Sequence, residues 1–183
     1  LYGYKDEESV RYGNLESVSV VEQGSGYAKP PFVLVDGVPD LVQANLSGSV
    51  IESYTVTSQK VFPVVPTIEV TSGRGAIVRA VVTGDKVTSL IIDNAGEFYS
   101  SPPTVRITDN NGKGRFADFT AIVDVDGRIT GFEKNAEGVF YNQNTVRVDI
   151  IPVGSGAKAQ VELTEWNFNR YEKYKSVMDD QNG

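Results

Sequence analysis

The chain has 183 residues, with 24 acidic and 17 basic side chains and with neither Cys nor His. Its formal net charge of −7 opposes binding to nucleic acid, because a phosphate backbone requires clustered Lys and Arg. The absence of Cys excludes disulfides and thiolate metal sites, and the absence of His removes the commonest general base and transition-metal ligand. We therefore expect a non-catalytic protein that uses no cofactor or metal and binds no nucleic acid.

The start of the chain lacks the apolar region of a signal peptide. Residues 1–14 are assigned to an N-terminal extension. No stretch approaches the ~20 apolar residues that cross a bilayer, so no membrane insertion is expected. Because the chain begins with Leu1 and stops at Gly183 in a polar run, we expect it to be a piece of a longer polypeptide.

Residues 15–163 are predicted to contain four diverged copies of one short unit, at about 15–49, 50–86, 87–128 and 129–163. An aromatic residue anchors each copy, and the four anchors are Tyr27, Phe62, Tyr99 and Tyr141. No polar residue recurs beside these aromatics. We therefore interpret them as structural anchors that cap a hydrophobic core, and not as ligand-binding residues.

Proline and glycine residues follow the aromatic anchor in a similar order in the successive copies. A proline-led strand follows at Pro31, Pro66 and Pro103, while the fourth copy has Asn144 in this place. A Gly-x-Gly turn comes next in the later copies, at 73–75, 112–114 and 154–156. Equivalent strands are therefore expected to begin near residues 32, 67, 104 and 145.

The segments between these turns alternate apolar and polar residues, as half-buried antiparallel strands do. In the last copy Val146, Val148 and Ile150 share one face. Turn residues at 84–85 and 126–127 predict tight hairpins. The fold class expected is all-β, with tandem three-stranded antiparallel units in sandwich- or barrel-like packing and a C-terminal helical tail.

The tail is assigned to residues 164–183. It lacks Gly and Pro from residue 167 to residue 178 and has apolar residues at helical spacing. A short isolated helix is marginal in water, so this one is expected to pack on another surface. We predict an assembly interface on the tail, formed by Trp166, Phe168, Tyr171, Tyr174 and Met178.

Two Asp-rich segments partly match an EF-hand calcium loop. The match from Asp124 to Glu133 has Ile122 where the first ligand should be, and the match at Asp109 has Ile107 in that place. Both flanks are strand-like. We therefore predict hairpin turns at these segments, with no metal site.

The repeat resembles that of a known group of proteins. The segments Gly24-Ser25-Gly26-Tyr27-Ala28-Lys29-Pro30-Pro31 and Gly96-Glu97-Phe98-Tyr99-Ser100-Ser101-Pro102-Pro103 resemble the Gly-x-Gly-Tyr-x-x-Pro-Pro repeats of virion structural proteins from contractile-tailed marine cyanophages. The resemblance spans about residues 15–163. It implies a tail, baseplate or fibre component located in the virion, whose partners are other virion proteins or copies of itself.

Three alternatives belong to other functional classes. A carbohydrate-binding or host-surface adhesion module, which would contact a host surface glycan, requires aromatics that stand in solvent. A bacterial adhesin repeat requires stability that depends on calcium. A carboxylate-only hydrolase requires two acids within ~5 to 10 Å of one another in a cleft.

Overall fold

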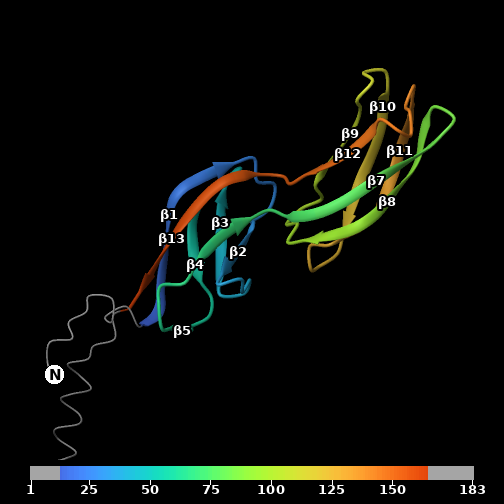
Figure 1. Ribbon diagram of the computed structural model, residues 1–183. Helices are drawn as coiled ribbons and strands as arrows, with labels where there is room; N and C mark the ends of the chain where they lie inside the picture. The colour runs from blue at the N-terminus through green and yellow to red at the C-terminus, as the bar shows by residue number, and fades with distance from the viewer. Residues whose placement is uncertain (1–12, 165–183) are drawn as a thin grey trace, which may run out of the picture.

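The computed structural model describes residues 13–164, and all regular secondary structure in this part of the chain is β-strand (Figure 1). Every strand pair is antiparallel. The predicted all-β class is thus confirmed for these residues, among which no helix is long and apolar enough to cross a membrane. The predicted helical tail lies outside the described residues from residue 165 onward, and so do Trp166, Phe168, Tyr171, Tyr174 and Met178.

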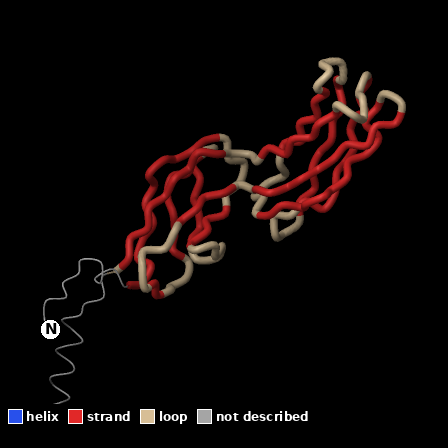
Figure 2. Tube along the Cα trace, in the orientation of Figure 1, coloured by secondary structure: helices blue, strands red, loops and turns tan. Residues whose placement is uncertain are grey.

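The strands form two lobes that lie end to end (Figures 1 and 2). The first lobe contains β1 (Gly13–Ser25), β2 (Phe32–Val35), β3 (Val42–Ser47), β4 (Val50–Val56), β5 (Val61–Phe62), β6 (Ile68–Thr71) and β13 (Ser155–Leu163). The second lobe contains β7 (Arg74–Thr83), β8 (Lys86–Glu97), β9 (Thr104–Asp109), β10 (Arg115–Val123), β11 (Ile129–Val139) and β12 (Val146–Ile151). The second lobe is therefore inserted between β6 and β13 of the first.

The same order of neighbours occurs in both lobes. In the first lobe β13 pairs with β1, β1 lies beside β4, β4–β3–β2–β6 form one sheet, and β6 lies beside β13. In the second lobe β7 pairs with β8, β8 lies beside β11, β11 pairs with β10, β10 lies beside β9, β9 pairs with β12, and β12 lies beside β7. Each succession closes on itself around an apolar interior.

Each lobe has its own hydrophobic core, because alternate residues of its strands point inward. Leu15, Val35 and Ile51 are completely buried in the first lobe, and Val87 and Phe119 lie in the core of the second. The cores share no residue. Each lobe is thus held together mainly by its own apolar contacts.

The strands that follow the aromatic anchors begin at residues 32, 68, 104 and 146, each within one residue of the predicted position. These strands pair with one another, β2 with β6 and β9 with β12. The predicted hairpin turn at Gly84-Asp85 is also confirmed. Turns at 48–49, 84–85 and 124–128 fall at the expected boundaries of the units, although the assignment of four copies stays a prediction.

The two Asp-rich segments use their carboxylates to build turns. Asp124 Oδ1 accepts hydrogen bonds from the backbone N–H groups of Asp126 and Arg128, at 3.0 and 2.9 Å. Asp109 accepts from the backbone N–H groups of Asn111 and Asn142, at 3.2 and 2.9 Å, and from the hydroxyl of Thr145. The carboxylates therefore replace backbone acceptors in the loops at the ends of the strands.

The pKa of Asp109 is lowered from its ordinary value of 3.8. Burial alone raises this pKa, but the hydrogen bonds from Thr145, Asn111 and Asn142 favour the carboxylate more strongly. Because the folded-state pKa lies below the unfolded one, the charged form stabilises the fold above pH ~4. That stabilisation is lost as the pH falls through the folded-state pKa.

We therefore predict that Asp109→Asn lowers the free energy of unfolding at pH 7 and flattens its decline below pH 4. The matched control is Asp126→Asn, since the Asp126 side chain accepts no hydrogen bond within residues 13–164. Urea unfolding curves between pH 2.5 and pH 7 measure both effects. Parallel pH profiles for Asp109→Asn and the wild type would contradict this account.

Candidate functional site

Three of the four aromatic anchors make one recurring contact. The hydroxyl oxygen of each tyrosine accepts a hydrogen bond from the backbone N–H of an alanine on the neighbouring strand, and the distances are 3.2 Å for Tyr27–Ala157, 3.3 Å for Tyr99–Ala76 and 3.3 Å for Tyr141–Ala117. Each of these tyrosines is only 3 % exposed. We call this arrangement the tyrosine lock. The recurring polar partner of the tyrosines is a backbone N–H group, and no polar side chain takes this place.

A glycine three residues before the tyrosine makes room for each lock. These glycines are Gly24, Gly96 and Gly138, with φ values of 64°, 66° and 68°. A Cβ atom at Gly138 would lie 2.6 Å from the Tyr141 ring and 2.6 Å from the carbonyl oxygen of Arg115. A second glycine, Gly154, Gly73 or Gly114, lies directly against the ring and immediately precedes the partner strand. A side chain larger than a hydrogen atom at these glycines would displace the tyrosine ring from its buried position.

The backbone of each lock tyrosine also reaches the other hairpin of its lobe. The N–H of Tyr99 donates to Gly127 O at 3.0 Å, and that of Tyr141 donates to Asp85 O at 2.9 Å. The N–H of Tyr27 donates to Ser49 O at 3.1 Å. Tyr99 and Tyr141 thus each tie the mouth of one hairpin to the turn of another, and Tyr27 ties the paired ends of β1 and β13 to the turn between β3 and β4.

Phe62 does not form a lock. Its ring is buried in the first core and has no hydroxyl, and Gln59 stands where the locks have glycine. Val61 and Phe62 instead pair with Asn14 and Gly13 at the start of β1. The four predicted anchors are therefore all buried, but only the three tyrosines share one mechanism.

Comparison of successive repeat units along the sequence does not reveal the Tyr27 lock. Its two halves come from opposite ends of the described chain, since Tyr27 follows β1 and Ala157 lies in β13. The signal available in the sequence is a second recurring pattern, a glycine three residues before an alanine. It occurs at 73–76, 114–117 and 154–157, which are the three segments that receive the tyrosines.

The Tyr27 and Tyr99 locks face one another where the two lobes meet. Ser72 donates a hydrogen bond to Gly154 O at 2.6 Å and thus joins the two strand connections between the lobes. The ring of Phe98 lies 5.4 Å from that of Phe32 in the first lobe. These contacts make the junction partly apolar.

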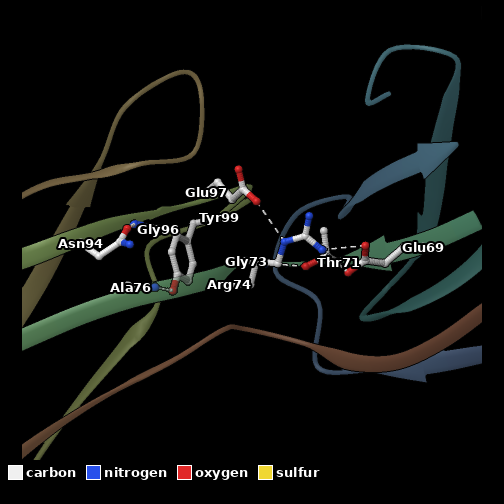
Figure 3. A network of polar contacts seen from close by, with 9 residues as sticks. All are labelled: Glu69, Thr71, Gly73, Arg74, Ala76, Asn94, Gly96, Glu97 and Tyr99. Atoms are coloured by element: carbon white, nitrogen blue, oxygen red, sulfur yellow. Dashed lines mark hydrogen bonds and ion pairs between the residues drawn. The ribbon is translucent and has the colours of Figure 1, made fainter. Parts of the chain in front are cut away.

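Arg74 forms ion pairs at the junction of the two lobes (Figure 3). Its guanidinium group binds both carboxylate oxygens of Glu69, at 2.6 and 2.7 Å, and one oxygen of Glu97 at 3.1 Å. The same group lies 5.5 Å from the centre of the Phe98 ring. A single arginine thus contacts a carboxylate of the first lobe and two side chains of the second.

A cleft of about 550 Å³ opens beside this junction. Its walls include equivalent positions of the two Tyr-x-x-Pro-Pro segments, Lys29 and Pro30 from one, Ser101 and Pro102 from the other. Phe32 lines the cleft, and Ser101 is a lining residue only 6 % exposed whose hydroxyl has no hydrogen-bond partner within residues 13–164. Comparison with protein-family models, curated proteins and solved structures found no match to the chain.

We predict that Tyr141→Phe lowers the free energy of unfolding by about 1–3 kcal/mol, because the Ala117 N–H loses its acceptor in a partly buried site. The matched control is Tyr54→Phe, since the buried Tyr54 hydroxyl has no partner in the described part of the chain. That control should be neutral or slightly stabilising. Urea unfolding measures both variants, and equal losses would show that the lock hydrogen bond contributes nothing specific.

Proposed function

We propose that the chain is a non-catalytic structural component of a phage virion, in the tail, baseplate or a fibre, and that it acts through contacts between subunits. The observation that carries this proposal is that the recurring Gly and Tyr residues form contacts within the chain. The three tyrosines are buried and bonded within the chain, so the repeated motif serves to hold hairpins together. A motif used in this way builds a rigid body for assembly.

The fold is consistent with this role. Two lobes joined end to end give an elongated body, and their neighbour order is the same (Figure 2). We propose that this order comes from four diverged copies of a unit with a hairpin, an aromatic anchor and a proline-led strand, packed in pairs as two small sandwiches. Repeated units that stack on their neighbours are a common way to build extended scaffolds.

The sequence supports the virion assignment through the Gly-x-Gly-Tyr-x-x-Pro-Pro resemblance. Both intact copies of Tyr-x-x-Pro-Pro lie at the junction of the lobes, where they wall one cleft. The recurring residues thus serve the contact between two β bodies. Partners proposed on this basis are other virion proteins or further copies of the chain.

Immunogold electron microscopy of the phage that encodes the chain tests this proposal. An antiserum against the purified protein should label intact particles at the tail, baseplate or fibres. The matched control is the same serum after absorption with the purified protein, which should label nothing. Particles free of label, with the protein found only in the soluble part of the lysate, would contradict the virion role.

The junction cleft favours a second candidate function, binding of a host surface glycan. Phe32, Pro30 and Pro102 offer apolar walls, and Lys29 and Asp124 also line the cleft. A concave site that combines apolar walls with polar side chains is a candidate for binding a small ligand. The tyrosines themselves do not stand in solvent, because Tyr27, Tyr99 and Tyr141 are buried. A glycan array separates the candidates, since retention of one glycan class that Phe32→Ala abolishes would favour binding at the cleft.

A further inference from the structure

Besides the glycines that contact the ring, each tyrosine lock has two further backbone positions with left-handed φ angles. One is the residue before the tyrosine and the other is the residue before the alanine. Glycine occupies three of these six positions, and phenylalanine occupies the other three. The glycines are Gly26, Gly75 and Gly156, and the phenylalanines are Phe98, Phe116 and Phe140, with φ values of 59°, 71° and 64° for the phenylalanines. A bulky side chain is disfavoured in this conformation, so its presence calls for a compensating contact.

Phe98 has such a contact. Its ring lies against Phe32 across the junction, and the guanidinium group of Arg74 lies over it. Glycine stands at the equivalent position of the facing lock, at Gly26. The strained phenylalanine is thus used where one lobe meets another.

Phe116 and Phe140 belong to the Tyr141 lock, and no described residue covers them. Their exposed fractions are 76 % and 59 %. They lie in one hairpin mouth, because Arg115 pairs with Val139 across β10 and β11. This mouth is at the end of the second lobe farthest from the first (Figure 1). We call the surface formed by Phe116, Phe140, Arg115 and Asp85 the distal tip.

The distal tip repeats two groups of the junction, an arginine and a phenylalanine, but Val139 pairs with Arg115 where Glu97 pairs with Arg74. Arg115 stands one residue after Gly114, as Arg74 stands one residue after Gly73, and Phe140 corresponds to Phe98. Arg74 binds Glu69 of the other lobe, whereas Arg115 has no ion pair within residues 13–164. The missing partner of the tip is therefore a surface with an aromatic group and a carboxylate.

The tip itself provides both. Asp85 lies there, since its Oδ2 accepts the N–H of Phe140 at 3.1 Å. In a two-fold contact the Arg115 of each copy can meet the Asp85 of the other, and the exposed phenylalanines of the two copies can pack together. We propose that two copies of the chain associate through their distal tips, in the same way that two lock ends meet at the junction within one chain.

This contact is small. Four fully exposed aromatic side chains would bury on the order of 600–1,000 Å², and these phenylalanines bury less because they are only 76 % and 59 % exposed. The buried area is therefore well below the ~1,200 Å² of a stable complex. The dimer is therefore expected to be weak and to depend on concentration. Many copies held in one assembly would strengthen it through effective concentration. The dimer rests on the proposed function in one respect only, namely that the chain acts through contacts between subunits.

The test is sedimentation equilibrium of the full chain over a wide concentration range. The weight-average mass should rise from 19.9 kDa toward twice that value, without larger species. The variant Phe116→Gly with Phe140→Gly should weaken association at least ~tenfold. Its melting temperature should be unchanged or higher, because glycine accepts the left-handed φ angles. This pair of effects separates loss of an interface from loss of the fold.

The matched control is Phe98→Gly, the same substitution at the equivalent position of the buried junction. It should lower the melting temperature and leave the dimer intact. A chain that stays monomeric at every concentration would overturn the proposal, and so would a dimer that survives the double tip substitution. An open ladder of larger species would overturn the two-fold arrangement. Each of these results can coexist with particles labelled by the antiserum, so failure of the tip contact is distinguishable from failure of the virion role.

Discussion

The tyrosine lock is the contact on which the rest of the described structure depends. Each lock tyrosine uses its hydroxyl to hold two paired strands and its backbone N–H to hold the turn of a neighbouring hairpin. The hairpins of the second lobe are therefore tied at both ends. Contacts that fix both ends of a hairpin favour a rigid body, which suits the structural role that we propose.

The locks also decide where the lobes can meet. Two of them face one another at the junction, and the third lies at the distal tip. The Tyr27 lock has glycine at both residues that precede its tyrosine and its alanine, so a lock can form without phenylalanine there. Phenylalanine occupies such positions only in the two locks of the second lobe. Phe98 contacts the first lobe, while Phe116 and Phe140 are exposed. The contact of Phe98 at the internal junction is the precedent for the dimer that we propose through Phe116 and Phe140.

Much of the fold could be predicted from the sequence because its signals are local. Alternation of apolar residues, proline at strand entry and turn residues at 84–85 each act within a few positions. The pairing of the first and last strands could not be predicted, because it joins Tyr27 to Ala157 over 130 residues. The junction cleft and the distal tip also depend on long-range packing. The lock hydrogen bond was missed because its donor is a backbone group, which leaves only a glycine and an alanine in the sequence.

The central claim is that the tyrosines require glycine because the backbone approaches the ring closely. Replacement of Gly138 and of Gly84 by alanine tests it most directly. Both residues have left-handed φ angles, 68° and 67°, but an added Cβ meets the Tyr141 ring at Gly138 and nothing within 4 Å at Gly84. Gly84→Ala should cost only the conformational penalty of about 1–2 kcal/mol. Gly138→Ala should cost at least about 2 kcal/mol more, measured as the free energy of unfolding in urea. Equal losses for the two variants would contradict the account.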